Sequence, residues 1–152
     1  MLRARITVRG SKQVQRKLKK LGDDLNNHYD AMRNIGRLAS RYFSNQGFNS
    51  RGGVFGERWE PLNRAYAIAK ARRFPGKPPL VATGAMRDGF FAKPRQSSVV
   101  IDNRAPQYKY HQSTAPRSKL PRRPMAGIND PIREIVRQEL QKSIEKKIRM
   151  AG

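Results

Sequence analysis

The alternation of apolar and polar residues predicts three short strands. Near the start of the chain, residues 2–8 alternate between apolar side chains and arginine or threonine, which is the period of a strand with one buried face. Residues 90–93 and 97–103 are rich in aromatic and β-branched side chains, and the proline-containing segment 94–96 separates them. We therefore expect residues 90–103 to form a β-hairpin.

A second pattern predicts helices before that hairpin. From Val14 to Tyr42, apolar positions recur every three or four residues, as they do along one side of a helix. Gly22 interrupts the pattern in the manner of a helix C-cap, and Asp23 or Asp24 can cap the helix that follows. We expect one helix from Lys12 to Leu21 and a longer one from Asp24 to Asn45. The apolar stripe is interpreted as an intramolecular core in preference to a contact between subunits.

Further helices are predicted after residue 60. Asn63 can cap a short helix that ends at Arg73, and Leu80–Arg87 reads as an extended piece followed by one helical turn capped by Thr83. Asp130 can cap the last helix, with a proline as its first helical residue. The apolar face of this last helix is expected to cover the sheet: Ile132, Ile135, Val136, Leu140, Ile144 and Ile148.

These elements indicate one α+β domain spanning residues 1–152, with a small, mainly antiparallel sheet packed by long N-terminal and C-terminal helices. Long loops are expected at about 46–58 and 113–123. The glycine-rich segment 46–56 lacks the order of a phosphate-binding loop and is interpreted as a flexible projection that a partner orders. No apolar run approaches the roughly 20 residues of a membrane span. No signal peptide is evident, so we expect a protein that stays in the cytoplasm where it is made.

The formal net charge of +22 predicts attraction to polyanions. The basic residues are dispersed along the sequence, whereas dedicated nucleic-acid modules more often concentrate them beside stacking aromatics. We therefore favour solvated faces and contacts with acidic neighbours over a dedicated DNA-binding site. The basic segment 113–123 is the best candidate for an arm that reaches a neighbouring subunit. The candidate contacts with partners or DNA are Lys12, Arg16, Lys19, Lys20, Arg117, Lys119, Arg122 and Arg123.

No catalytic or metal-binding constellation emerges from the residue types. The chain has no cysteine and two histidines, and His28 lies on the apolar stripe, where histidines are usually packed structural residues. Two tyrosines accompany His111 between the hairpin and the last helix, but no nucleophile, base and orienting carboxylate can be assembled around them. Asp102 ends a strand without a second acidic partner in a nuclease pattern. We expect no enzyme activity, no cofactor and no metal.

Four short motifs give the middle of the chain a family resemblance. They are Trp59-Glu60-Pro61-Leu62, the segment Leu80–Arg87 with its Thr-Gly pair, Tyr108–Gln112 with Tyr-His-Gln, and Pro121–Pro124 with the pattern Pro-x-Arg-Pro. In this order they resemble the phage virion morphogenesis family, the tail-completion proteins of tailed bacteriophages. The matching positions are Trp59, Pro61, Leu62, Leu80, Thr83, Gly84, Met86, Arg87, Tyr110, His111, Pro121, Arg123 and Pro124. The chain departs from the family at Asn63-Arg64-Ala65, where a threonine is usual, and at Ser113-Thr114, where an aromatic and a glycine are usual.

The resemblance implies a structural virion protein at the phage head–tail junction, as a tail-completion, neck or tail-terminator subunit. It implies assembly in the host cytoplasm into a homo-oligomeric ring, with a hexamer as the expected size. The implied partners are connector and tail-tube proteins, with non-specific contact to genomic DNA and none to a membrane. The alternative is a basic nucleic-acid-binding protein of the ribosomal type, which the charge alone suggests. A phage-borne nuclease or cell-wall hydrolase is disfavoured because paired carboxylates are missing.

Overall fold

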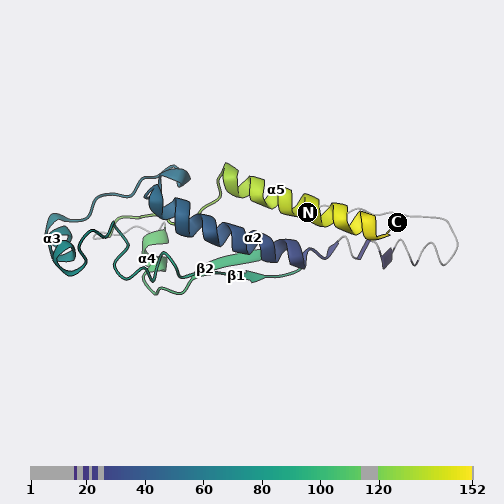
Figure 1. The fold of residues 1–152 in the computed structure, drawn as a ribbon, viewed down its shortest axis with the longest axis horizontal. Coiled ribbons are helices and arrows are strands. Elements are labelled where there is room, and N and C mark those ends of the chain that lie inside the picture. The colour runs from purple at the N-terminus through teal and green to yellow at the C-terminus, as the bar shows by residue number, and fades with distance from the viewer. Residues whose placement is uncertain (1–15, 17–18, 21, 24–25, 114–119, 152) are drawn as a thin grey trace.

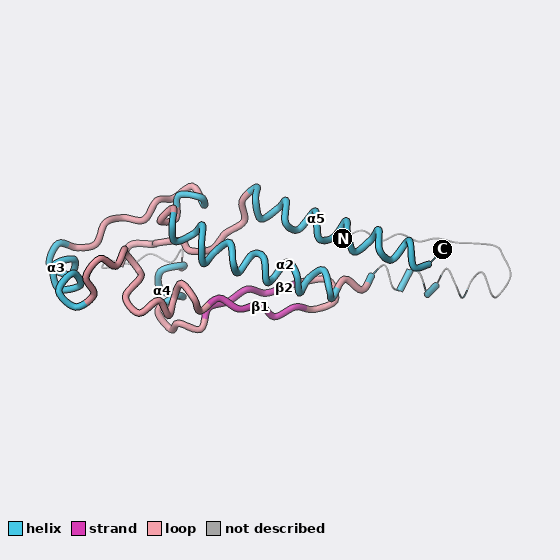
Figure 2. The backbone as a smooth tube through the Cα atoms, in the orientation of Figure 1, coloured by secondary structure: helices cyan, strands magenta, loops and turns pink. Residues whose placement is uncertain are grey.

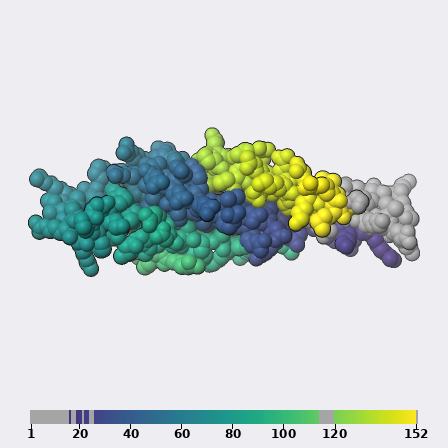
Figure 3. All heavy atoms as spheres, viewed as in Figure 1, coloured from purple at the N-terminus to yellow at the C-terminus, as the bar shows by residue number. Residues whose placement is uncertain are grey.

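The structure is a computed structural model that describes residues 16, 19–20, 22–23, 26–113 and 120–151. The strand expected at residues 2–8, most of the expected first helix, and residues 114–119 of the expected arm lie outside this part. The described chain is elongated (Figures 1 and 3). Its combination of several helices with one two-stranded antiparallel sheet confirms the α+β class.

The centre of the molecule is the helix α2 (Tyr29–Tyr42), which continues as one π-helical turn, η1 (Phe43–Gly47). The hairpin of β1 (Phe90–Pro94) and β2 (Val99–Asn103) packs on one side of α2. The helix α5 (Asp130–Ala151) packs on the other side (Figure 1). The prediction that the last helix covers the sheet is therefore wrong, because α2 lies between α5 and the hairpin.

Three smaller elements lie towards one end of the molecule. They are the single turn η2 (Gly53–Phe55), the helix α3 (Arg64–Arg73) and the short helix α4 (Tyr108–Gln112). Figure 2 shows that long loops connect them and that α3 occupies the tip. As predicted, Asn63 caps α3, since its Oδ1 accepts a hydrogen bond from the Ala65 N–H at 3.0 Å.

The buried face of α2 confirms that the apolar stripe builds an intramolecular core in this part of the chain. Met32, Ile35 and Ala39 are buried, and Gly36 lies so close to β1 that an added Cβ would approach the Ala92 Cβ to 2.4 Å. The predicted helix start is wrong. Gly22 and Asp23 are helical, and the break falls at residues 27–28, where the Asn27 side chain accepts from the Tyr29 N–H at 3.1 Å.

The hairpin prediction is confirmed, with strand ends that differ by one or two residues. Phe90 pairs with Asn103 and Pro94 with Val99. Arg95 N–H donates to the Ser98 carbonyl at 2.7 Å, which closes the turn later than expected and delays the start of β2. The His28 N–H donates to the Gln96 carbonyl at 2.8 Å, so the turn is tied to the start of α2.

The first turn of α5 is capped by Asn129 and not by Asp130. The Asn129 Oδ1 accepts from the Ile132 N–H at 3.1 Å, while Asp130 lies in the first turn and forms an exposed ion pair with Arg133 at 2.9 Å. An amide side chain one residue earlier reaches the same free N–H groups that we assigned to the carboxylate. Ile132 is buried, and further along the helix Ile144 and Ile148 are exposed.

One aromatic core joins the hairpin, α2 and the loops. Its buried members are Ala39, Phe43, Phe48, Trp59, Val81, Phe90, Met125 and Ile132. Phe48 is only 5% exposed and meets Trp59 edge-to-face, with ring centroids 5.3 Å apart. Gly52, with a φ of +80°, packs so closely on Trp59 that an added Cβ would lie 2.6 Å from the indole ring. The glycine-rich segment 46–56 is therefore folded onto the core, and its prediction as a flexible projection is wrong.

Candidate functional site

Trp59 anchors a junction between segments that are far apart in the sequence. Its side chain is 6% exposed, and the indole Nε1–H donates to the Pro124 carbonyl at 2.6 Å. Tryptophan usually finds such a partner when it is buried, because its one donor would otherwise be left without a hydrogen bond. The first and the last of the four motifs therefore meet directly.

Arg123 strengthens the same junction from the other side. Its side chain is 4% exposed; Nε donates to the Glu60 carbonyl and Nη2 to the Pro61 carbonyl, both at 3.0 Å. Burial lowers the pKa of Arg123, while Glu60 and Tyr66 raise it. The prediction of Arg123 as a contact for partners or DNA is wrong, because its side chain is buried and its guanidinium donates hydrogen bonds to two backbone carbonyls of the same chain.

Gln112 joins the third motif to the junction. Its Nε2 donates to the Ala126 carbonyl at 2.7 Å, and its Oε1 accepts from the N–H groups of Met125 at 2.9 Å and Ala126 at 3.2 Å. The His111 carbonyl accepts from the Arg123 N–H at 2.9 Å. Met125, held between these bonds, is 0% exposed. An amide can satisfy both a carbonyl and an N–H at once, so Gln112 is suited to fixing an irregular strand-like segment.

The packed aromatic of that motif is Tyr108 and not Tyr110. The Tyr108 ring meets Phe90 at 5.6 Å between centroids, whereas Tyr110 is exposed, with the Lys109 ammonium over its ring. Residue spacing alone could not distinguish them, because both precede His111 on the same short helix.

The remaining motif, Leu80–Arg87, forms a turn beside the core. Thr83 Oγ1 accepts from the Ala85 N–H at 3.3 Å, and the Asp88 N–H donates to the Gly84 carbonyl at 2.9 Å, which confirms one capped helical turn. Leu80 has a φ of +61°, so the expected extended piece is wrong at that residue.

The two ends of this turn are bonded to other elements. Asn103 Nδ2 donates to the Met86 carbonyl and Ser44 Oγ to the Arg87 carbonyl, both at 2.7 Å. The Arg87 guanidinium pairs with Asp88 at 2.9 Å and lowers the pKa of that carboxyl. The motif therefore links β2 and η1 through backbone carbonyls.

The titratable groups near these motifs are arranged for packing. Burial, with the charge of Asp102, raises the pKa of Tyr108 to about 12, so the phenol stays protonated. Asp102 itself is exposed, and its carboxylate accepts from the neighbouring Asn103 N–H at 2.8 Å. Among the described residues, no group of three or more histidine, aspartate or glutamate side chains is placed to hold a metal ion.

The predicted contact residues divide into three groups. Arg16, Lys19 and Lys20 are exposed on the helical segment before α2. Arg122 is half-buried and pairs with Glu57, which ties the base of the expected arm to the body. The remaining members lie outside the described residues: Lys12, Arg117 and Lys119.

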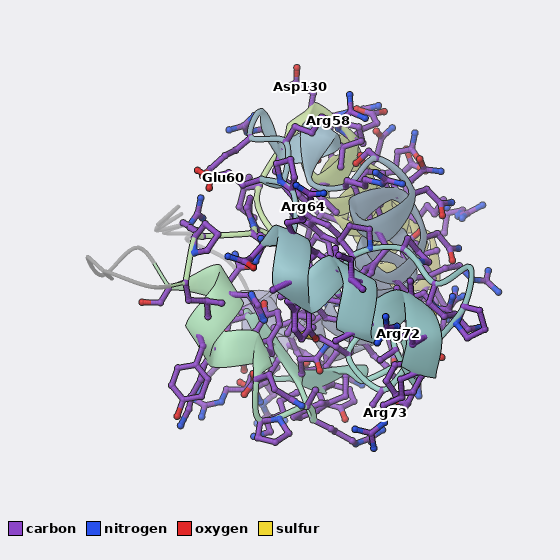
Figure 4. The ribbon with its side chains drawn as sticks, turned by 90° about the vertical axis from the view of Figure 1, so that its left-hand side faces the viewer. Arg58, Glu60, Arg64, Arg72, Arg73 and Asp130 are labelled. Atoms are coloured by element: carbon purple, nitrogen blue, oxygen red, sulfur yellow. The ribbon has the colours of Figure 1, made fainter. Side chains whose placement is uncertain are left out.

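The end of the molecule around α3 carries basic residues that are not among the predicted contact residues. Residues 61–87 contain six basic and no acidic side chains. Figure 4 looks onto this end and shows Arg58, Arg64, Arg72 and Arg73 on its surface. The stretch without acidic residues was the available signal, but only the fold shows that Arg58 joins the others and that they are exposed.

A cleft of about 940 Å³ lies at the other end, where the start of α2 meets the last turns of α5. Its lining includes Lys20, Asn34, Glu139 and Lys142. Glu139 is buried, and it accepts from Asn34 Nδ2 at 3.3 Å and from Lys142 Nζ at 2.9 Å. The carboxylate is therefore already compensated by its neighbours.

None of the helices in the described ranges is both long and apolar enough to cross a membrane. No family model, curated protein or solved structure matches the chain. The resemblance to the virion morphogenesis family therefore rests on the four sequence motifs alone.

Proposed function

We propose that this protein is a structural component of the phage head–tail junction, acting by assembly into a ring with copies of itself. The observation that carries the proposal is the junction of motifs: the Trp-x-Pro-Leu, Tyr-His-Gln and Pro-x-Arg-Pro segments are hydrogen-bonded to one another. Trp59 binds Pro124, Arg123 binds Pro61, and Gln112 binds Met125. Residues that recur together because they form one structural unit support common ancestry better than four unconnected matches.

The chemistry of the junction also supports assembly over catalysis. Its polar side chains bind backbone carbonyls and N–H groups, which stabilises irregular loops and leaves no activated nucleophile among the motif residues. Such loops on a rigid core are suited to contacting neighbouring subunits. The proposed neighbours are other copies of the chain together with connector and tail-tube proteins.

The proposal is tested by the mass and shape of the purified protein. Light scattering over a range of concentrations, followed by negative-stain electron microscopy, is expected to show closed rings, with six subunits as the expected number. Immunogold labelling of phage particles made with this chain is expected to place it at the neck. The proposal would be overturned if the purified protein stayed monomeric at every concentration and if the gold label lay elsewhere on the particles or was absent from them.

A basic nucleic-acid-binding protein of the ribosomal type is the second candidate, favoured by the exposed arginines on α3: Arg64, Arg72 and Arg73. For that class, we expect a monomer whose affinity for nucleic acid falls steeply with salt, because phosphate contacts release counterions. DNA binding by an assembled ring would not support this class, since DNA passes through a head–tail junction.

A further inference from the structure

We propose that the end of the molecule around α3 binds the phosphate backbone of duplex DNA. This α3 end is defined by five exposed cations on and beside the helix: Arg58, Arg64, Arg72, Arg73 and Lys77. The proposal goes beyond the head–tail assignment and does not depend on it, because it follows from the charge and geometry of one surface.

The charges of the α3 end are available for a partner. None of the five side chains forms an ion pair or hydrogen bond with a described residue; Arg73 lies over the Phe74 ring at 5.5 Å, a contact that leaves its donors free. Glu60 lies at the edge of this end in Figure 4 and interacts electrostatically with the buried Arg123. Like charges held together without acids repel each other, and binding of a polyanion relieves that repulsion.

The fold presents α3 in a fixed position. Asn63 caps its first turn, and Lys70, the one buried residue of the helix, donates from Nζ to the Pro78 carbonyl. Burial lowers the pKa of Lys70, as expected for an ammonium held inside the fold. A ten-residue helix that buries a single side chain is marginal by itself. The cap and the lysine therefore hold a helix that is exposed on most of its surface.

The dimensions of α3 fit a DNA groove. Arg73 follows Arg64 by nine positions, which corresponds to about 13.5 Å at 1.5 Å per residue. The major groove is about 12 Å wide, so the two ends of the helix can reach phosphates on both strands. Tyr66, on the same helix, is 59% exposed, and aromatic side chains accompany cations in many nucleic-acid interfaces.

The composition of this surface favours a polyphosphate over an acidic protein. Protein–protein interfaces are poor in lysine and acidic residues and surround their arginines with apolar and aromatic side chains, whereas the α3 end presents five exposed cations, four of them labelled in Figure 4. Four of the five are arginines, whose planar guanidinium donates two parallel hydrogen bonds to a phosphate. The contacts expected are with backbone phosphates, so the binding should show little sequence preference.

The test is fluorescence anisotropy with a labelled duplex of about 20 base pairs, roughly two helical turns, over a series of salt concentrations. One variant replaces the helix cations: Arg64→Gln, Arg72→Gln and Arg73→Gln. The control variant removes the same charge from α5: Arg133→Gln, Arg137→Gln and Arg149→Gln. Circular dichroism and melting curves of both establish that they fold, and the single change Arg72→Gln serves if the triple variant does not.

We expect the α3 variant to lose about tenfold or more in affinity, and its slope of log affinity against log salt to fall by about 0.9 per lost contact. The α5 control should lose clearly less. Equal losses in the two variants would overturn the proposal in favour of diffuse attraction, as would a wild-type protein that does not bind the duplex. Tighter α3-dependent binding of poly-L-glutamate than of DNA would assign the surface to an acidic protein instead.

These outcomes are separate from those for the head–tail proposal. A ring that does not bind DNA would contradict only the proposal that the α3 end binds DNA. A monomer that binds DNA through these arginines would contradict only the proposal of ring assembly.

Discussion

The helices α3 and α5 are both rich in basic residues, but they differ in how far acidic residues compensate that charge. In α5, six basic residues alternate with four acidic ones, and three ion pairs form at a spacing of three residues. In α3, four basic residues occur with no acidic residue, and none of its three exposed arginines forms an ion pair with a described residue. The helix that packs along the body is compensated, whereas the helix at the tip is not. The positive charge is therefore unevenly compensated: residues 61–87 carry six cations and no acidic residue, whereas α5 mixes both signs. Exposed cations without an ion pair among the described residues also occur elsewhere, as at Arg37, Arg41 and Arg95.

The largest expected difference between the body and the tip is the loss of stability when an aromatic side chain is removed. Trp59→Ala should lower the free energy of unfolding by about 3–5 kcal/mol, because it empties a core site and removes the donor to Pro124. Tyr66→Ala, an equally aromatic change at the exposed tip, should alter it by less than about 0.5 kcal/mol. Denaturant unfolding measures both. If the Trp59→Ala variant unfolded at the same denaturant concentration as the wild type, Trp59 would not anchor the core and would instead be an interface residue.

A second contrast uses arginine at both sites. Arg123→Ala should cost about 1.5–3 kcal/mol of unfolding free energy, because a buried side chain is removed and two part-buried carbonyls lose their charged donor. Arg64→Ala should leave unfolding nearly unchanged, because no described residue depends on its guanidinium. Thermal melts measure both variants, and equal shifts in their melting temperatures would contradict the distinction between a buried and an exposed arginine.

A smaller effect is expected from pH at the junction of α2 and α5. Burial lowers the pKa of His28, and the charge of Lys147 lowers it further. The unfolded chain therefore binds this proton more readily, so stability should fall as pH drops below about 6.5 and reach its full loss below the folded pKa. His28→Gln should flatten this part of the profile. The test is the free energy of unfolding of the wild type and of His28→Gln, measured from pH 7 downwards. If the two stability profiles ran parallel, the proposed effect of His28 would be ruled out.

The smallest expected effect concerns the compensated charges of α5. Hydrogen bonds from Arg137 and Gln138 hold the pKa of Glu134 at about 2. Arg137→Ala should return that pKa towards its ordinary value near 4.5, as followed by an NMR titration of the side-chain carboxyl. In the wild type, the stabilising effect of this carboxylate should be lost as pH falls from the ordinary value towards 2. A Glu134 pKa that does not respond to the substitution would show that solvent, not Arg137, sets it.

Much of the fold could be predicted from local patterns. The hairpin, the helix capped by Asn63 and the single turn capped by Thr83 all depend on neighbouring residues, and all three are present. Expectations failed where the answer depended on distant partners. Arg123 reads as a basic arm residue until Glu60 and Pro61 are seen to receive its hydrogen bonds, and the loop of Phe48 reads as a projection until Trp59 covers it.

Local patterns in the sequence predicted the hairpin, α3, α5 and the large positive charge, because these follow from composition and from periodicity along the chain. They did not predict the helix break at residues 27–28 or the helix α4. Only the tertiary structure decided which cations remain free. That outcome is set by burial and by contacts between residues more than 60 positions apart, as between Arg122 and Glu57. Ion pairs hold some cations and burial removes others, whereas the arginines around α3 are exposed and form no ion pair with a described residue.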